Sequence, residues 1–181
     1  KNSLSKYDIT IIPLMINRSD FDTRLPRNSQ WSIETYYRLM LMDILPDNID
    51  RILYLDVDLI INGSVEEFYH VDFKGDEVIV ADDSNGKRSR DTFGSKQAEM
   101  FKDMLDNGFR YFNAGVMLFN VQEIRKTHNF NTYMKAVEEW DYAMEAPDQD
   151  ILNYVHGYKA SYIDYMKYNL FARIKKKKKY T

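Results

Sequence analysis

The chain has 181 residues, of which 44% are hydrophobic and 29% are charged, as expected for one globular domain. Its 25 basic and 28 acidic residues give a net charge of −3, which argues against nucleic acid as a partner. It has no cysteine, which excludes a disulfide scaffold, a zinc ribbon and a thiol nucleophile. No run approaches the roughly 20 apolar residues that a membrane-spanning helix requires. We therefore expect a cytoplasmic protein.

Five consecutive lysines, Lys175 to Lys179, lie near the end of the chain. Such a run is usually a solvated surface segment, and the alternative is contact with an anionic lipid surface. The second reading would place the protein peripherally at the inner face of the membrane. Because the sequence does not start with methionine, we expect it to be part of a longer chain.

Apolar residues follow two alternating periodicities, which predicts an α/β fold with a helix-covered parallel or mixed sheet. Strands are predicted at 8–14, 51–55, 78–81, 116–121 and 160–163, and helices at 32–45, 97–105, 131–140 and 148–155. Ser32 is expected to cap the first helix, and the strand at 51–55 is expected to be buried on both faces. A polar surface loop is expected at 83–92. No repeat or linker indicates a second domain.

An Asp-Val-Asp motif, Asp56 to Asp58, follows directly after the apolar run 51–55. In an extended segment residues i and i+2 point to the same side, so both carboxylates can converge on one cation. Hard ions such as Mg²⁺ and Mn²⁺ prefer oxygen ligands, and ligands of open α/β sheets bind beyond the carboxyl ends of strands. The alternative is a polar strand end with hydrated carboxylates, and the motif alone does not decide between the two.

Three further polar groups lie where a predicted element meets a loop. They are Asp82-Asp83 after the run 78–81, Asn113 and Gly115 before the run 116–121, and Asp148-Gln149-Asp150 at the start of a helix. Each has a structural alternative, respectively a turn, an amide that satisfies backbone groups, and ordinary helix N-terminal charge. An acidic cluster this dense is tolerated only with a cation, so we expect one shared site.

Four segments together resemble glycosyltransferase family 8. They are Ser32 to Leu39, Arg51 to Asp58, Tyr111 to Val116 and Asp148 to Asn153, in the order and spacing of that family. This is the retaining group that contains lipopolysaccharide galactosyl- and glucosyltransferases and glycogenin. The resemblance implies a GT-A fold, which is a Rossmann-like mixed sheet with helices on both faces.

The implied activity is transfer of glucose or galactose from a UDP-sugar to a saccharide or lipopolysaccharide-type acceptor. By this resemblance Asp56 and Asp58 hold Mn²⁺, or Mg²⁺, on the donor diphosphate, and Arg38 reaches the donor. The resemblance assigns the remaining donor contacts to Asp56 near the ribose, Asp83 at the sugar, and Asn113 and Gly115 in the donor-sugar turn. Asp148 and Gln149 correspond to the catalytic pair beneath the anomeric carbon, with Gln149 nearest to it.

The sequence departs from the family pattern in two places. It lacks the initial strand and loop that hold the uracil, and it lacks a downstream His-x-x-Gly-x-x-Lys-Pro-Trp segment whose histidine completes the metal shell. None of its histidines, His70, His128 and His156, has that spacing. The third metal ligand is therefore unassigned, and we expect residues 1–181 to form a single catalytic domain that is incomplete at both ends.

Two other functions remain open from the sequence. A phosphohydrolase of the haloacid dehalogenase type also ends a strand in Asp-x-Asp, but that reading leaves Phe112 to Val116 and Asp148 to Asn153 unexplained. A catalytically silent module that binds a nucleotide sugar would carry the same motifs. Release of UDP distinguishes the enzyme from the module.

Overall fold

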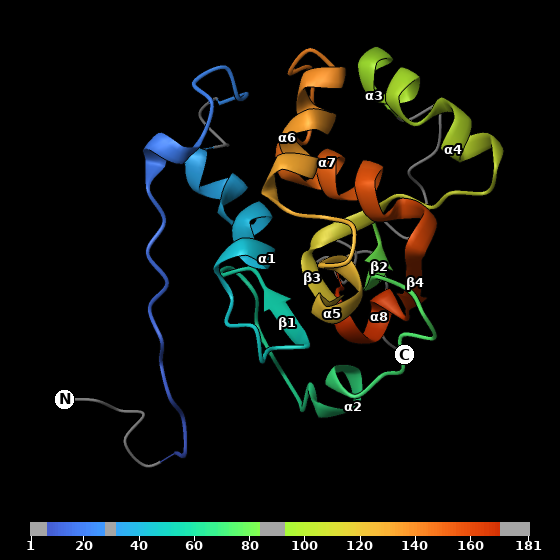
Figure 1. The fold of residues 1–181 in the computed structure, drawn as a ribbon. Coiled ribbons are helices and arrows are strands. Elements are labelled where there is room, and N and C mark those ends of the chain that lie inside the picture. The colour runs from blue at the N-terminus through green and yellow to red at the C-terminus, as the bar shows by residue number, and fades with distance from the viewer. Residues whose placement is uncertain (1–6, 28–31, 84–92, 171–181) are drawn as a thin grey trace.

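A computed structural model describes residues 7–27, 32–83 and 93–170 (Figure 1). Its centre is a four-stranded sheet with the strand order β1-β3-β2-β4. The strands are β1 (Arg51–Leu55), β2 (Val78–Asp82), β3 (Phe112–Asn120) and β4 (Ala160–Ile163). β3 pairs antiparallel with β1 and with β2, whereas β2 and β4 are parallel. The predicted mixed sheet is confirmed.

The helical segments largely follow the predicted periodicity. In chain order they are η1 (Arg18–Asp20), η2 (Ile33–Met40), α1 (Leu41–Ile44), α2 (Glu66–Tyr69), α3 (Ser95–Met100), α4 (Lys102–Asp106), α5 (Val121–Ile124), α6 (Phe130–Glu139), α7 (Pro147–His156), η5 (Gly157–Lys159) and α8 (Tyr165–Tyr168). Ser32 occupies the N-cap position of η2, but its side chain makes no capping hydrogen bond there. In the described part of the chain, no helix is long and apolar enough to span a bilayer.

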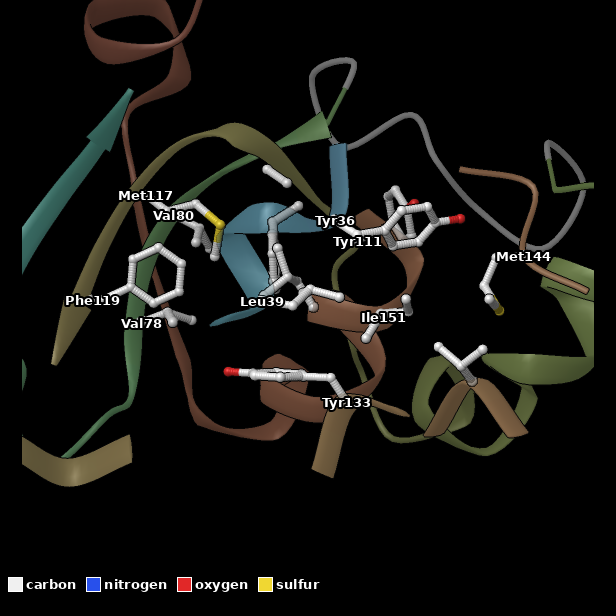
Figure 2. Close-up of a cluster of buried hydrophobic side chains, with 14 of the residues drawn as sticks. Tyr36, Leu39, Val78, Val80, Tyr111, Met117, Phe119, Tyr133, Met144 and Ile151 are labelled. Atoms are coloured by element: carbon white, nitrogen blue, oxygen red, sulfur yellow. The ribbon is translucent and has the colours of Figure 1, made fainter. Parts of the chain in front are cut away.

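Helices cover both faces of the sheet. Alternate side chains of a strand point to opposite faces, so Val78 and Val80 face one side and Ile79 the other. The first face packs against η2, α6 and α7 in a large buried cluster (Figure 2). The second face packs against Phe68 of α2, which is 1% exposed, and against Tyr168 of α8. Helices on both faces are what the resemblance implied.

Two predictions about strands are wrong. Residues 8–14 have no regular structure and run away from the sheet (Figure 1), with Ile11 and Ile12 exposed by 67% and 69%. Apolar residues alone do not determine which strand a segment pairs with, and no described strand pairs with this one, although β1 and β4 each have an open edge. β1 is half-buried rather than buried on both faces, because it lies at the edge of the sheet. Most of the expected loop (84–92) and the lysine run (175–179) lie outside the described residues.

Arg125 fixes the segment that joins α1 to β1. Its Nε donates to the carbonyl of Met42 (3.1 Å), and Nη2 donates to that of Leu45 (2.5 Å). Its Nη1 also reaches the carbonyls of Pro46 and Ile49, at 3.3 and 3.4 Å. The last carbonyls of a helix have no partner within the helix, so this guanidinium satisfies groups that would otherwise be unpaired.

Replacing Arg125 with Met is therefore expected to lower the free energy of unfolding by about 1–3 kcal/mol, because partly buried carbonyls lose charged donors. Lys126→Met is the matched control, since Lys126 is 61% exposed and pairs only with Glu123 among the described residues. Urea denaturation of the two variants and the parent protein measures the difference. Equal losses in both variants would contradict the capping role of Arg125.

Candidate active site

The polar groups singled out in the sequence meet at one edge of the sheet. β1 ends at Leu55, which pairs with Val116, so the end of β1 lies beside the N-terminal half of β3. The amide of Asp56 donates to the carbonyl of Gly115 at 2.9 Å. The start of α7 packs against the same end of β3 through Gln149. Three separate motifs thus converge here.

Arg38, from η2, contacts all three of these motifs. Its Nη2 donates to Oδ1 of Asp56 at 2.7 Å, and its Nη1 donates to the carbonyl of Ala114 at 2.7 Å. Its Nε lies 2.9 Å from Oδ2 of Asp148, although the direction of the N–H bond makes this an ion pair without a hydrogen bond. The Arg38 side chain is only 11% exposed, so its charge needs these partners.

Tyr54 supports this arrangement, and sequence reasoning missed it. The Arg38 guanidinium lies over the Tyr54 ring, 4.3 Å from its centroid, and the Tyr54 hydroxyl donates to Oδ1 of Asp56 at 2.8 Å. Both of these hydrogen bonds therefore end on the same oxygen of the Asp56 carboxylate. Tyr54 lies within the apolar run 51–55 and Asp56 follows directly after it, two residues from Tyr54, which is the sequence signal that could have indicated this pair.

Gly115 leaves space for the Asp56 carboxylate. A Cβ at position 115 would lie 2.8 Å from Oδ2 of Asp56 and 3.0 Å from Oδ1 of Asn113. The amide of Gly115 donates to that Asn113 oxygen at 2.9 Å. A glycine is required here by this close approach, because any larger side chain would displace one of the two polar groups.

Gln149 is held in one orientation. Its Oε1 accepts a hydrogen bond from the amide of Ala114 (2.9 Å) and another from Nδ2 of Asn113 (3.2 Å). Asn113, which donates to Gln149, also accepts a hydrogen bond: its Oδ1 accepts from Nδ2 of Asn169 at 2.8 Å. Two donors occupy the Gln149 oxygen, which leaves its Nε2 as the group available for a ligand.

Two buried polar residues fix the first turn of α7. Asp150 is fully buried and accepts hydrogen bonds from the amides of Glu145 (2.9 Å) and Ala146 (2.8 Å) and from the hydroxyl of Tyr111 (2.6 Å). Asn153 donates to the carbonyl of Phe112 and accepts from its amide, each at 2.8 Å. Asp150 acts as more than helix N-terminal charge, because it connects α7 to Tyr111, directly before β3, and to the loop that precedes α7.

The pKa of the Asp148 carboxyl is shifted by its surroundings in the site. Burial raises the pKa of Asp148 to about 6, although the Arg38 guanidinium acts in the opposite direction. The Asp148 side chain is 7% exposed. A carboxyl with a shifted pKa in a polar cluster is typical of a functional site.

Asp58 and Asp83 lie less centrally. Asp58 is exposed in the turn after Asp56. Asp83 is 4% exposed, and its amide donates to the carbonyl of Tyr111 at 3.0 Å, which places it one position beyond β2. Its neighbour Asp82 instead pairs with Arg110. The structure thus brings together six of the predicted site residues directly: Arg38, Asp56, Asn113, Gly115, Asp148 and Gln149.

The structure resembles known glycosyltransferases. The model of "Glycosyl transferase family 8" matches residues 1–181. A lipopolysaccharide 1,2-glucosyltransferase of Escherichia coli is 32% identical over 173 residues, which are 94% of this chain and 48% of that protein. A lipopolysaccharide 1,3-galactosyltransferase of Salmonella typhimurium is 30% identical over 77% of this chain and 41% of its own length.

A solved structure of the galactosyltransferase LgtC, in complex with donor and acceptor sugar analogues, superimposes with a TM-score of 0.72. It is 29% identical and covers 84% of this chain and 52% of that chain. This confirms the GT-A type of fold, and the chain belongs to glycosyltransferase family 8. The chain spans about half the length of the curated relatives that it matches.

The raised pKa of Asp148 predicts a pH dependence of stability. Its pKa is about 6 in the folded chain and 3.8 without the protein environment, so the folded state binds more protons between these values. This carboxyl therefore destabilises the fold as pH rises from about 4 to about 7. In Asp148→Asn this pH-dependent loss is absent. The free energy of unfolding of the variant, relative to that of the parent, should therefore increase by up to about 3 kcal/mol as pH rises over this range.

Urea denaturation at several pH values measures this difference. Ile151→Val, in the same helix, is the control, because it changes a fully buried side chain without altering any titratable group. Its free energy of unfolding relative to the parent should be the same at each pH. A constant difference for Asp148→Asn as well would show that Asp148 titrates alike in both states.

Proposed function

We propose that this chain forms the donor-binding half of a retaining, metal-dependent hexosyltransferase. The substrate would be UDP-glucose or UDP-galactose, and the acceptor a saccharide or a lipopolysaccharide-type glycolipid. The observation that carries the proposal is the contact of Arg38 with both Asp56 and Asp148, which joins the Asp-Val-Asp motif to the motif at the start of α7. The relatives named above act on lipopolysaccharide, which supports the acceptor class.

The residues at the edge of the sheet suit a hard divalent cation. Asp56 and Asp58 offer carboxylate oxygens, and Oδ2 of Asp56 faces Gly115 while Oδ1 is taken by Arg38 and Tyr54. Oxygen donors are what Mn²⁺ and Mg²⁺ prefer. Asp56 and Asp58 would hold this ion, which when bound neutralises charge on the UDP leaving group. Both ions remain candidates, and no third protein ligand is assigned.

The chain's own residues favour attack from the face that UDP leaves. Asp148 pairs with Arg38, and the Gln149 oxygen is occupied by two donors, so neither is free to act as a nucleophile on the anomeric carbon. In the proposed step the bond from that carbon to the UDP oxygen breaks, and its electron pair leaves with UDP. The acceptor oxygen bonds on the same face, and its proton passes to the departing phosphate. Gln149 Nε2 and Arg38 would orient the donor.

The haloacid dehalogenase alternative is wrong, because the chain belongs to another family. The silent binding module remains a distinct outcome. It would hold a UDP-sugar in the presence of the metal but would not release UDP.

The first test is a titration of the full-length protein with UDP, UDP-glucose and UDP-galactose, with and without Mn²⁺, followed by assay of released UDP. We expect metal-dependent binding and slow release, and Asp58→Asn should lower the release rate about 10²- to 10³-fold, the range for losing one group that stabilises charge. Asp47→Asn, an exposed carboxylate in a turn, is the control. Binding without release would favour the module, and no Mn²⁺-dependent binding would overturn the proposal.

Gln149→Ala separates positioning from simple affinity. If Gln149 orients the donor in the transition state, kcat should fall by about 10- to 100-fold while KM changes by less than about threefold. Gln122→Ala, an exposed glutamine in α5, should leave both parameters unchanged. Steady-state kinetics of UDP release measures both, and a normal kcat would remove Gln149 from the mechanism.

A further inference from the structure

A second cluster of titratable side chains lies away from the candidate active site. Glu77 comes directly before β2, His156 ends α7, and His128 lies in the connection from α5 to α6. The active-site residues Asp148 and Gln149 lie at the opposite end of α7. At a rise of about 1.5 Å per residue, Asp148 and His156 are about 12 Å apart along the helix axis. The two clusters are therefore separate.

The cluster is buried and closely spaced. Glu77 and His156 are both 0% exposed, and Nδ1 of His156 lies 2.7 Å from Oε2 of Glu77. Nε2 of His128 lies 3.3 Å from the same oxygen. One ligand atom from each residue lies within 4.8 Å of the other two. In the described part of the chain, this is the one group of three such side chains that could hold a metal ion.

Two of the three residues, His156 and Glu77, have supporting contacts of the kind found around metal ligands. The Tyr133 hydroxyl lies 2.9 Å from Nε2 of His156, the nitrogen that would carry the proton if Nδ1 bound a metal. Lys159 donates to Oε1 of Glu77 at 3.0 Å, which leaves Oε2 for the other partners. Nδ1 of His128 is buried and has no hydrogen-bond partner among the described residues, so His128 lacks the contact that Tyr133 provides for His156.

Two of the three ligand separations are close to those around a small tetrahedral ion, and the third, between one nitrogen of each histidine, is at most 4.8 Å. With bonds of about 2.0–2.1 Å, adjacent ligands of tetrahedral Zn²⁺ lie about 3.3 Å apart. The separation of His128 and Glu77 is already 3.3 Å, and that of His156 and Glu77 would have to widen by about 0.6 Å. Neutral imidazoles can bind without releasing protons if each moves its proton to the other ring nitrogen.

We propose that Glu77, His128 and His156 form a binding site for a borderline transition-metal ion, Zn²⁺ by preference. Two imidazoles and one carboxylate match Zn²⁺ or Co²⁺ better than the hard ions that suit Asp56 and Asp58. Three protein ligands leave the fourth position of a tetrahedral ion to water. The His128 side chain is 19% exposed and provides the route to solvent. The ion would link β2, the start of α6 and the end of α7.

Titration of metal-free, full-length protein with Co²⁺ tests the proposal without any activity assay. Tetrahedral Co²⁺ gives visible absorption bands, which should saturate at one equivalent and disappear when Zn²⁺ displaces the ion. Zn²⁺ should also raise the melting temperature. His128→Asn should weaken Co²⁺ binding at least about tenfold, because it removes one of three ligands.

The chain has three histidines, so the exposed His70 gives a matched control. His70→Asn and Asp58→Asn should keep the Co²⁺ bands and the Zn²⁺-induced rise in melting temperature. Glu77→Gln and His156→Gln should lose both, and if either fails to fold by circular dichroism, the partly exposed His128 alone decides. The proposal is overturned if the parent protein shows no Co²⁺ bands, or if His128→Asn retains them at unchanged affinity.

Discussion

The buried charge of Arg38 is the constraint on which the candidate site depends. A guanidinium stays protonated in proteins, so a nearly buried one must be compensated by nearby acceptors. Here the acceptors are Asp56, Asp148 and the carbonyl of Ala114, which come from three separate segments. Two carboxylates against one guanidinium leave an excess negative charge, which is the sign that a divalent cation would balance. The same contact therefore organises the site, and its excess negative charge is the basis for the proposed cation.

Helix α7 connects the candidate active site with the second buried cluster. Its first turn carries Asp148 and Gln149, and Asp150 and Asn153 fix that turn to the loop before it and to β3. Its last residue, His156, belongs to the buried cluster with Glu77. A helix held by buried polar contacts at both ends has little freedom to shift, because each movement would leave a buried group unpaired.

The short apolar runs predicted the central strands well. Val78 to Ala81 lies in a fully buried strand, and its pattern could be interpreted without knowledge of its neighbours. Residues 8–14 show an equally strong pattern but form no strand, because apolar content does not determine whether a segment pairs with a sheet. β1 was located correctly but its burial was not, because position within the sheet depends on strand order.

The sequence by itself determined the family, the mixed α/β class and the identity of the polar residues at the ends of elements. These properties depend on short motifs and on local periodicity, both of which are visible in the sequence. Only the tertiary structure decided which of them touch. The contacts of Arg38 with Asp56 and Ala114 span 18 and 76 residues, and Glu77 and His156 are 79 residues apart. Such pairs leave no local signal, because they form only when the sheet and its covering helices pack together.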